Sequence, residues 1–446
     1  MERYSAYKDS GIDWIGEIPA GWDVRRVKTF ATASGGGTPS KDNPSFWDGE
    51  IPWVSSAEVK QKFIDDTSQH ISEDAIANSS TNLYPAGTTV MVVRSGILKH
   101  TIPVSFITRD MAVNQDIKAF TFTDYSKRFF RYFVNGMNDR LLLVLTKSTT
   151  TVDNIDMDQF MICPFTYPSM QEQELIADYL DERTGAIDAA VEDVERSVEL
   201  LNEYRQSVIS EAVTKGLDPN ASMKDSGIDW ISQIPVEWKA TRLKWLGLLQ
   251  KGSGIKREDI IAEGKPCIRY GELYTTYGHE VKKVISKIPS ELYEIQPKLC
   301  DGEILMALTG ETKEDIGRAT VNQTGNDIAF GGDTLAVKHL TCNGRFLSFA
   351  INSEYFNQQR TQGAKGDIIV HLSAQWIANC QIAVPSFTEQ QAIADYLEKK
   401  LNGIDSLISQ KQSLIVRLKE YRASLISECV TGKVRVPCVH ETETED

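Results

Sequence analysis

The residue types that most often carry catalysis or bind metals are scattered along this chain of 446 residues. The chain contains neither the G-x-x-x-x-G-K-[ST] loop that cradles phosphate nor a paired-acid and lysine cluster like that of a nuclease. None of its histidines share the helical spacing of a metal-ligand pair, and its odd number of cysteines includes no C-x-x-C. The cysteines are Cys163, Cys267, Cys300, Cys342, Cys380, Cys429 and Cys438, and the histidines are His70, His100, His279, His339, His371 and His440. We predict no catalytic residue, no metal site, no disulfide framework and no cofactor bound by this chain.

A glycine-rich stretch, SGGGTPSKDNPS at 34–45, is the nearest approach to a cofactor loop. It lacks both the G-x-G-x-x-G spacing and a preceding apolar strand, so a flexible loop is the better interpretation. Asn43-Pro44-Ser45-Phe46 has only a partial likeness to the Asx-Pro-Pro-aromatic loop with which amino-methyltransferases hold a target amine. We therefore predict neither a nucleotide cofactor nor methyl transfer by this stretch.

Side chains that suit nucleic-acid contact gather in Gly- and Ser-rich loops between β-like runs. Base reading needs forked or amide donors, whereas phosphate binding needs Lys, Arg or small hydroxyl groups. The DNA-binding candidates in the first half are Thr38, Ser40, Lys41, Arg94, Ser95, Lys99, His100, Lys147, Thr149 and Thr150. Those in the second half are Lys256, Arg257, Arg269, Tyr270, Thr309, Lys313 and Lys365. Gly96 and Gly310 would let the backbone approach phosphates closely. Each residue alone could equally be a solvated surface side chain, so the prediction rests on the set.

The chain repeats itself once. The stretch KDSGIDWIGEIPAGWDVRRVKTF at 8–30 returns at 224–246 with 13 of 23 positions identical, at an offset of 216. Residues 167–217 return at 384–434 with 21 of 51 positions identical, at an offset of 217. A period this long is that of two whole domains rather than of a solenoid. The sequence therefore predicts a tandem duplication.

The blocks between these matches diverge in sequence but keep landmarks. Residues 112–120 align with residues 329–337, and KSTTTVDNI from Lys147 aligns with AKGDIIVHL from Ala364, both at an offset of 217. We interpret the blocks as one fold with two different surfaces, which suggests two related binding tasks on different targets.

The two longer repeated segments predict long helices. Each opens with a capping box, Ser169 with Glu172 and Ser386 with Glu389. Each then carries an apolar heptad seam, broken by Arg205 in the first helix and by Arg422 at the same place in the second. The seams are Ile187, Val191, Val194, Val198, Leu201 and Val208 in the first helix, and Ile404, Ile408, Ile415, Leu418 and Leu425 in the second, where Lys411 also interrupts. Helices of roughly 45 residues would be about 65 Å long. We expect them to pack on each other as an antiparallel coiled coil, with Gly216 ending the first.

The blocks themselves predict an α+β fold of two similar mixed α/β domains. Their β-like runs are Thr89–Val93, Val104–Ile107, Ile117–Phe122, Glu303–Leu308, Arg318–Val321 and Leu335–Lys338. The expected division is a first domain at 1–166, a helix at 167–217, a second domain at 218–383, a helix at 384–434 and an acidic tail at 435–446.

The net charge of −14 is uneven along the chain. Residues 167–217 carry 4 Lys and Arg against 12 Asp and Glu, whereas residues 20–166 carry 15 against 16 and residues 236–383 carry 18 against 17. The near-neutral blocks could still present basic faces, so the acidic total does not exclude nucleic acid. No apolar run long enough to span a membrane and no secretory signal stand out, and cysteine usage fits a reducing compartment. These features favour a cytoplasmic protein.

Four repeated segments in this order resemble the conserved regions of type I restriction-modification specificity subunits. They are the two copies of KDSGIDWI and the two helices that open with PSxxEQxxIADYL and close with YRxSxISExVT. GGTPSKDNPSFWDGEIPWV at 36–54 is also similar to the opening of many first recognition domains in that family. The resemblance covers almost the whole chain.

The resemblance implies that each divergent block is a target recognition domain for one half of a split, asymmetric DNA site. The helices would fix the gap between the half-sites, since readers of one duplex need a defined separation. Two modification subunits would bring S-adenosylmethionine and methylate adenine. Restriction subunits would bring ATP, Mg²⁺ and translocation. The chain itself would be non-catalytic.

Residues repeated in both halves are the candidates for docking these partners: Trp14, Trp22, Trp230, Trp238, Tyr204, Arg205, Tyr421 and Arg422. For the tryptophans, plain core packing is the alternative. For the whole chain, the alternatives are a coiled-coil adaptor that bridges two partners without touching DNA, and a lone methyltransferase or nuclease. The missing cofactor motifs argue against the latter.

Overall fold

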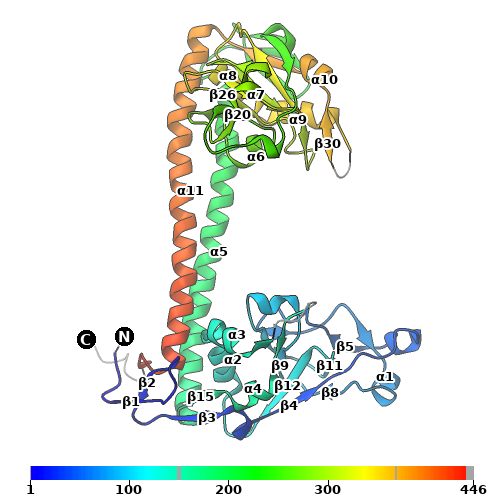
Figure 1. Ribbon diagram of the computed structural model, residues 1–446, viewed down its shortest axis with the longest axis vertical. Helices are drawn as coiled ribbons and strands as arrows, with labels where there is room; N and C mark the ends of the chain where they lie inside the picture. Colours follow the sequence, from blue (N-terminus) through cyan, green and yellow to red (C-terminus); the bar gives the residue numbers. More distant parts are fainter. Residues whose placement is uncertain (1, 148–151, 367–368, 438–446) are drawn as a thin grey trace. The chain divides into compact units, whose positions relative to one another are not determined.

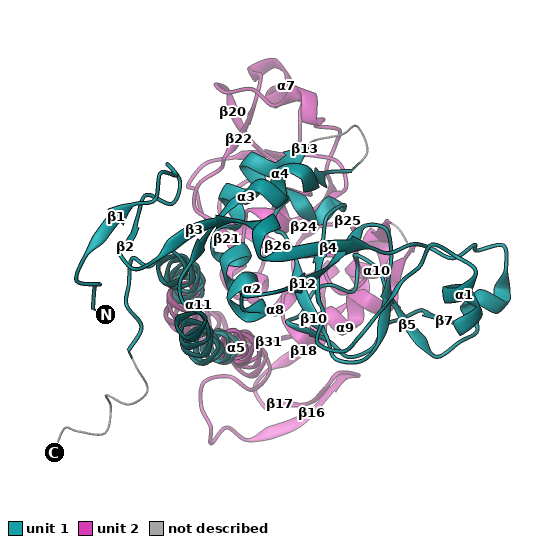
Figure 2. Cartoon of the chain, turned by 90° about the horizontal axis from the view of Figure 1, so that it is seen from below, with its two compact units in different colours: residues 1–194, 413–446 teal, residues 195–412 magenta. Residues whose placement is uncertain are grey.

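The computed structural model describes residues 2–147, 152–366 and 369–437, so the candidates Thr149 and Thr150, with Cys438 and His440, lie outside the described residues. The chain forms two compact units, coloured separately in Figure 2. Unit 1 comprises residues 1–194 and 413–446, and unit 2 comprises residues 195–412. Each unit combines one globular block with part of each long helix. The five-part division of the sequence stays a prediction.

Unit 1 is built on a five-stranded sheet in the order β4-β12-β9-β10-β6 and a four-stranded sheet in the order β7-β5-β11-β8 (Figure 1). The strands are β1 Tyr7–Asp9, β2 Glu17–Pro19, β3 Asp23–Arg26, β4 Ala31–Gly35, β5 Ile51–Val54, β6 Phe63–Ile64, β7 His70–Ile71, β8 Leu83–Tyr84, β9 Thr89–Val92, β10 Val104–Ile107, β11 Met111–Val113, β12 Ile117–Phe122, β13 Thr146–Lys147, β14 Asn154–Ile155 and β15 Pro164–Tyr167. The α-helices are α1 Glu73–Ala77, α2 Lys127–Gly136, α3 Asn138–Leu145 and α4 Met157–Ile162, and the 3-10 helices are η1 Val27–Thr29, η2 Pro44–Trp47 and η3 Gly96–Lys99.

Unit 2 repeats the two main sheets of unit 1. Its five-stranded sheet has the order β19-β28-β24-β26-β21 and its four-stranded sheet the order β22-β20-β27-β23. The strands are β16 Met223–Ile228, β17 Ile231–Pro235, β18 Lys239–Arg242, β19 Leu248–Lys251, β20 Lys265–Ile268, β21 Glu280–Val281, β22 Ser286–Ile288, β23 Lys298–Leu299, β24 Ile304–Ala307, β25 Thr309–Gly310, β26 Ala319–Asn322, β27 Ile328–Phe330, β28 Thr334–Lys338, β29 Ala364–Lys365, β30 Val370–Leu372 and β31 Gln381–Val384. The helices are α6 Glu272–Thr275, α7 Ser290–Ile295, α8 Gly344–Ile351, α9 Glu354–Gly363, α10 Ala374–Asn379, η4 Leu243–Trp245 and η5 Arg257–Asp259.

The matching sheets show that both blocks share one mixed α/β fold, as the sequence predicted. In each five-stranded sheet the pairs are antiparallel except at one edge, where β6 runs parallel to β10 and β21 runs parallel to β26. The six predicted β-like runs correspond to β9, β10, β12, β24, β26 and β28. Strand residues such as Met306 and Val337 are fully buried. Helices of unit 2 cover one face of its five-stranded sheet, and a second cluster of buried hydrophobic side chains covers the other face.

The long helices are α5, Met170–Lys215, and α11, Phe387–Val430 (Figure 1). In unit 1 the start of α5 packs with the end of α11, and in unit 2 the end of α5 packs with the start of α11, so the pairing is antiparallel in each. The predicted seam residues are buried or half-buried, while most of their neighbours along each helix are exposed. In the part of the chain that the structure describes, neither helix is apolar enough to cross a membrane.

The helix starts differ from the predicted capping box in one respect. The serine half is present, since Ser169 Oγ accepts from the Glu172 backbone N–H and Ser386 Oγ accepts from that of Glu389, both at 3.3 Å. The glutamate half is wrong, because each carboxylate binds an aromatic side chain instead. Glu172 accepts from the hydroxyl of Tyr4, which precedes the first repeated stretch, and Glu389 accepts from the indole N–H of Trp238 in the second repeated stretch. These acids therefore tie the N-terminal segment to α5 and the second repeated stretch to α11.

Candidate nucleic-acid interface

Two short strands and an isolated β-bridge of unit 1 bring Arg94, Asn154 and Lys147 into one row. β13 pairs with β14 so that Lys147 lies opposite Asn154, and an isolated bridge joins Asn154 to Arg94 on its other side. Backbone hydrogen bonds fix this arrangement, with the Ile155 N–H on the carbonyl of Val93 at 2.8 Å. We call the row Arg94–Asn154–Lys147 the unit 1 ladder. It places two DNA-binding candidates, Arg94 and Lys147, on either side of the Asn154 amide.

Acidic side chains stand beside both cations of the unit 1 ladder. The Lys147 ammonium lies 2.6 Å from the Asp156 carboxylate, a contact that lowers the pKa of Asp156. The Arg94 guanidinium, which is 55% exposed, lies 4.0 Å from the Asp116 carboxylate. Both cations are thus oriented by a neighbour yet remain open to solvent, as phosphate-binding side chains should be.

The glycine-rich loop is linked to this ladder through one hydrogen bond. The Thr38 hydroxyl donates to the Gln115 side-chain oxygen at 2.5 Å, and Gln115 precedes the Asp116 that faces Arg94. Ser40 and Lys41 are exposed in the same loop, where the Ser40 carbonyl accepts from the Trp47 indole. The loop around Thr38 is therefore positioned beside the ladder.

The second loop of unit 1 candidates is continuous with the ladder. The Ser95 N–H donates to the Asp153 carbonyl at 3.2 Å, and the Ser95 side chain caps η3. Lys99 and His100 follow at the end of η3 and are exposed, with the His100 carbonyl held by Asn138. All described candidates of unit 1 thus lie in segments tied to the ladder or to the adjoining loop.

Unit 2 contains the same ladder with different side chains. β25, β30 and β29 form a three-stranded sheet in which His371 lies opposite Thr309 on one side and Lys365 on the other. The helices that lead into and out of the hairpin, α9 and α10, match α3 and α4 of unit 1. We call the row Thr309–His371–Lys365 the unit 2 ladder. Two predicted DNA-binding residues, Thr309 and Lys365, therefore flank His371, which was not predicted.

The two ends of the unit 2 ladder differ in exposure. Thr309 is buried and its hydroxyl lies 3.1 Å from His371 Nδ1, so it contacts the histidine rather than solvent. Lys365 and His371 are exposed, and both line a cavity of about 700 Å³ together with Trp376. The structure thus makes Thr309 a support for His371, which corrects the expectation that Thr309 itself faces a ligand.

The other candidates of unit 2 are not gathered at its ladder. Lys256, which precedes η5, and Arg257, its first residue, are exposed beside the apolar cluster of the four-stranded sheet. The Arg269 guanidinium donates twice to the buried Glu272, at 2.9 and 3.1 Å, so that arginine balances an internal acid. Tyr270 is 40% exposed, and Lys313 is exposed in the loop after β25. In unit 2, therefore, the sequence-predicted set is only partly brought together.

The central residues of both ladders, Asn154 and His371, were missed by sequence reasoning. The strands that carry them are two and three residues long, too short for a hydrophobic alternation to mark them. One signal was present, because the alignment of KSTTTVDNI with AKGDIIVHL places Asn154 opposite His371. Comparison of the repeats at that position could have identified the pair.

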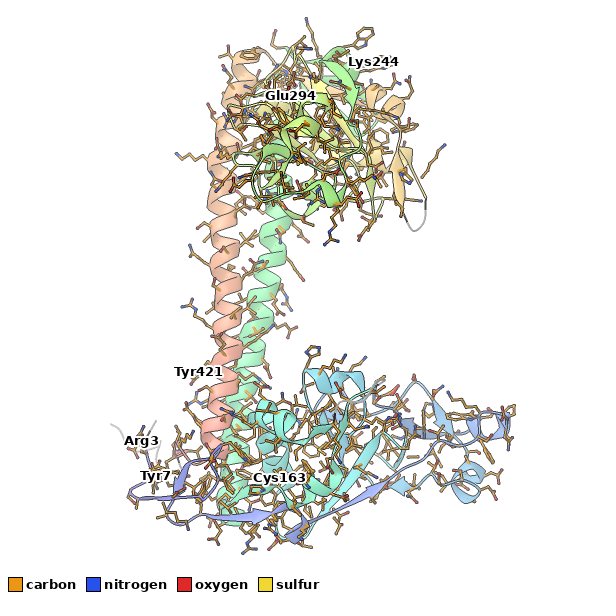
Figure 3. The ribbon with its side chains drawn as sticks, viewed as in Figure 1. Arg3, Tyr7, Cys163, Lys244, Glu294 and Tyr421 are labelled. Atoms are coloured by element: carbon orange, nitrogen blue, oxygen red, sulfur yellow. The ribbon has the colours of Figure 1, made fainter. Side chains whose placement is uncertain are left out.

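The repeated candidates for partner docking divide by burial. Trp22 and Trp238 are each 1% exposed and belong to the cores of units 1 and 2, so their indole rings cannot contact a partner directly. Tyr421, labelled on α11 in Figure 3, is half exposed. Tyr204 is similarly exposed on α5, while Trp14 and Trp230 are half-buried.

The seam-breaking arginines connect the two long helices. Arg205 Nε donates to Asp405 at 3.0 Å in unit 2, and Arg422 Nη2 donates to Asp188 at 3.1 Å in unit 1. The two pairs occupy equivalent positions in the repeat. An intramolecular role therefore explains why an arginine breaks both seams, beside any role in docking.

The cysteine thiols offer no reactive group among the described residues. Burial raises the pKa of Cys163, labelled in Figure 3, and of Cys342 to about 12. Within residues 2–147, 152–366 and 369–437, no three His, Cys, Asp or Glu side chains are placed to hold a metal ion. The chemistry on offer at the ladders is hydrogen bonding and charge.

Comparison with known proteins agrees with this geometry. Residues 19–193 match the family described as type I restriction modification DNA specificity domain. The chain is 29% identical over 203 residues to the type I restriction enzyme EcoR124I/EcoR124II specificity subunit of Escherichia coli, covering 45% of this chain and about half, 47%, of that protein. It is 23% identical over 440 residues to the MjaVIII specificity subunit of Methanocaldococcus jannaschii, covering 94% of each.

Solved structures show the same fold at low sequence identity. A structure described as the basis of complex assembly and conformational transition of the type I R-M system matches with a TM-score of 0.71 at 12% identity, covering 94% of this chain and 99% of that one. The HsdS subunit from Thermoanaerobacter tengcongensis matches with a TM-score of 0.52 at 12% identity, covering 94% of this chain and 98% of that one.

Proposed function

We propose a function from the premise that this chain belongs to the family of type I restriction-modification specificity subunits. In this proposal the chain reads a split, asymmetric site on double-stranded DNA. The block of each unit reads one half of the site. The predicted DNA-binding residues that remain exposed would contact the duplex, with Lys and small hydroxyl groups at phosphates and the forked Arg side chains at phosphates or bases.

The observation that carries the proposal is the presence of one ladder in two blocks that share a fold but differ in sequence. Both ladders keep a lysine at one end, Lys147 or Lys365, which suits a phosphate that every sequence provides. The remaining positions differ between the units, Arg94 and Asn154 against Thr309 and His371. Two domains that recognise different half-sites need the same backbone arrangement with different polar side chains on it.

The partners in this proposal are two modification subunits and, where present, restriction subunits. The modification subunits would supply S-adenosylmethionine and methylate adenine, and the restriction subunits would supply ATP-driven translocation and Mg²⁺-dependent cleavage. This chain would contribute recognition and no catalysis, in the cytoplasm where such complexes meet DNA. The exposed Tyr204 and Tyr421, with the half-buried Trp14 and Trp230, are the docking candidates whose burial permits contact.

The acidic net charge is compatible with this function. Asp and Glu exceed Lys and Arg mainly on the first long helix, whereas the two blocks are close to neutral. Local cations at the ladders can then attract phosphate, and the effect should depend on salt because bound counterions are released. The alternative, a helical adaptor that bridges two partners without reading DNA, predicts no such dependence.

The two functions are separated by duplex selection. The full chain, assembled with its modification subunits, is incubated with a pool of randomised duplexes over a salt series, and the bound fraction is sequenced. We expect a two-part motif, and an affinity that falls steadily as salt rises. A pool recovered without sequence preference, together with an affinity insensitive to salt, would support the adaptor.

Lysine variants refine the same experiment. Lys147→Ala and Lys365→Ala should weaken binding to all duplexes alike and reduce the salt slope by about 1 each. Lys215→Ala is the matched control, because Lys215 is an exposed helix residue 3.9 Å from Glu211 on its own helix. Equal salt slopes for all three variants would show that the ladder lysines do not contact phosphate.

A further inference from the structure

We propose that Asn154 and His371 are the residues that each block uses to distinguish a base in its own half-site. This assignment rests on the proposed DNA-reading function and adds to it two residues at equivalent positions. Neither residue belongs to the set expected from the sequence. The argument starts from their place in the ladders.

Both residues occupy the middle of a narrow polar β-ribbon. Asn154 is flanked across the strands by Arg94 and Lys147, and His371 by Thr309 and Lys365. The apolar neighbours Ile155, Val370 and Leu372 are buried, so the strand alternation turns His371 to the open face and leaves Asn154 partly exposed. The major groove of B-DNA admits a two-stranded β-ribbon. The hairpins β13-β14 and β29-β30 are such ribbons, and each pairs one lysine with one central residue. In each hairpin the central residue is placed to reach a base edge, while the lysine reaches the backbone.

The chemistry of the two central side chains suits base edges. The asparagine amide carries a donor and an acceptor side by side, which matches adenine N7 and N6 in the major groove. His371 has one ring nitrogen held by the Thr309 hydroxyl at 3.1 Å, which leaves Nε2 as its single free hydrogen-bonding atom. Asn154 should therefore read adenine through two hydrogen bonds, and His371 should read its base through one.

The surroundings of His371 leave room for a base. Its ring lines a surface cavity of about 700 Å³ together with Lys365 and Trp376, and the Trp376 side chain is 43% exposed. The Trp376 indole N–H donates to the Gln359 carbonyl at 2.8 Å, which fixes the ring on the wall of the cavity. β30, which carries His371, lies at the outer edge of unit 2 in Figure 1. A duplex can therefore approach the ladder without displacing core residues.

The repeat makes the assignment more specific than surface exposure alone. The same register places a lysine opposite the central residue in both units, although the hairpins differ in length by one residue. The central residue and the residue at the end opposite the lysine change between units, Asn154 and Arg94 against His371 and Thr309. Conserved geometry with a changed central side chain is what reading two different bases requires.

The experiment is duplex selection with the full chain assembled with its modification subunits. Asn154→Ala should relax the preference at one base pair of one half-site by about 5- to 150-fold, the value of a bidentate base contact. His371→Ala should relax one position of the other half-site by less, since one hydrogen bond is lost. Lys147→Ala is the matched control on the same ladder and should weaken all duplexes equally.

A gain of preference tests the assignment independently of folding. His371→Asn places at the second ladder the side chain found at the first, and we expect it to introduce an adenine preference at the position that His371→Ala relaxes. A misfolded protein cannot produce a new, position-specific preference. Circular dichroism melting of each variant checks that the blocks remain folded.

The outcomes separate this inference from the proposed function. If the unaltered chain selects a two-part motif but none of the three variants at residues 154 and 371 changes any base preference, the assignment is overturned and the proposed function stands. If the unaltered chain selects no motif, the proposed function fails and the assignment fails with it. A change confined to one base pair in each half-site supports the assignment.

Discussion

The side chains of Gln173 and Gln390 make the same two hydrogen bonds at the start of the two long helices. Gln173 accepts from the Ser126 backbone N–H at 2.7 Å and donates to the Pro168 carbonyl at 2.9 Å. Gln390 accepts from the Asn343 N–H at 2.7 Å and donates to the Pro385 carbonyl at 2.9 Å. Each amide is buried and joins a block helix to a long helix. This pairing explains why glutamine follows glutamate in both copies of the PSxxEQ motif.

Gln173→Met should destabilise the junction of α2 and α5 in unit 1. The thioether fills the space but leaves a buried N–H and a carbonyl without partners, at a cost of about 1–3 kcal/mol for each unsatisfied group. Hydrogen exchange of the Ser126 amide measures the loss of protection. Gln171→Met, at an exposed position two residues earlier, is the control and should change nothing. Equal protection in both variants would show that the amide bonds do not stabilise the junction.

Unit 2 should lose stability in mild acid through His279. Burial lowers the pKa of His279 to about 3 from an ordinary value of 6.5, with Arg205 and Arg318 lowering it further. Between these pH values the unfolded chain binds a proton that the folded unit does not, so the free energy of unfolding falls as pH falls, by about 1.4 kcal/mol per unit. His279 lines a surface cavity of unit 2. The acidic side chains of Glu280, Glu398 and Asp405 line the same cavity.

His279→Gln should flatten this pH dependence while keeping a polar side chain next to Asn352. Urea unfolding of both proteins over a series of pH values between about 5 and 7 measures the slope. The exposed His100→Gln variant should retain the original slope. An unchanged slope in His279→Gln would assign the acid sensitivity to another group.

At the scale of elements, one arginine on each block helix binds the long helix beside it. Arg128 of α2 contacts Glu174 at 3.1 Å, Asp178 at 2.7 Å and Asp181 on α5. Arg345 of α8 contacts Asp395 at 2.7 Å and Glu398 on α11. A lysine from an edge of each five-stranded sheet completes the network, Lys62 on Asp181 and Lys282 on Glu398. Both blocks are therefore fixed to their helices by the same set of charges.

Arg128→Met should weaken the attachment of α2 to α5. It removes the central cation from three carboxylates, and because the side chain is 27% exposed we expect a loss of about 1–2 kcal/mol rather than the larger cost of a fully buried pair. Arg128→Lys should fall in between, since lysine keeps the charge but lacks the planar fork. Hydrogen exchange across α2 and the first turns of α5 measures the effect. A lysine variant as weak as the methionine variant would show that geometry rather than charge holds the helices.

At the scale of the whole molecule, the duplication gives two blocks of one architecture. Sheet order, edge pairing, helix attachment and ladder position agree between units 1 and 2. At the ladders the side chains differ, with Arg94 and Asn154 in unit 1 against Thr309 and His371 in unit 2. Under the proposed function, two related but different blocks in a single chain allow an asymmetric DNA site, which two identical subunits would not.

Replacing residues 236–383 with a second copy of residues 20–166 should make the two half-sites identical. The repeated flanking segments provide equivalent junctions, because the entry strands and the long helices match in both halves. Duplex selection with the exchanged chain and its modification subunits measures the motif. Recovery of the original asymmetric motif would contradict the assignment of one half-site to each block.

The sequence predicted the larger elements because their signals are long or repeated. The heptad seams identified α5 and α11, and Gly216, with a φ of 77°, ends α5 as expected. The duplication identified two blocks of one fold. The order of strands in the sheets could not be predicted, since it depends on contacts between segments far apart in the chain.

The candidate site was predicted less completely than the fold. Arg94, Lys147 and Lys365 were found as exposed cations, and the structure places them on the ladders. Thr309 and Arg269 looked equally suitable, but a histidine ring engages the first and a buried glutamate engages the second. Residue type and loop composition cannot reveal such internal partners, which depend on tertiary contacts.

Mapping methylated adenines in a host that carries this chain, and in the same host without it, tests the central claim most directly. We predict that one motif, composed of two different half-sites separated by a fixed gap, is methylated only when the chain is present. Methylation that is identical in the two hosts, or loss of an uninterrupted motif, would contradict the claim that this chain specifies a two-part DNA site.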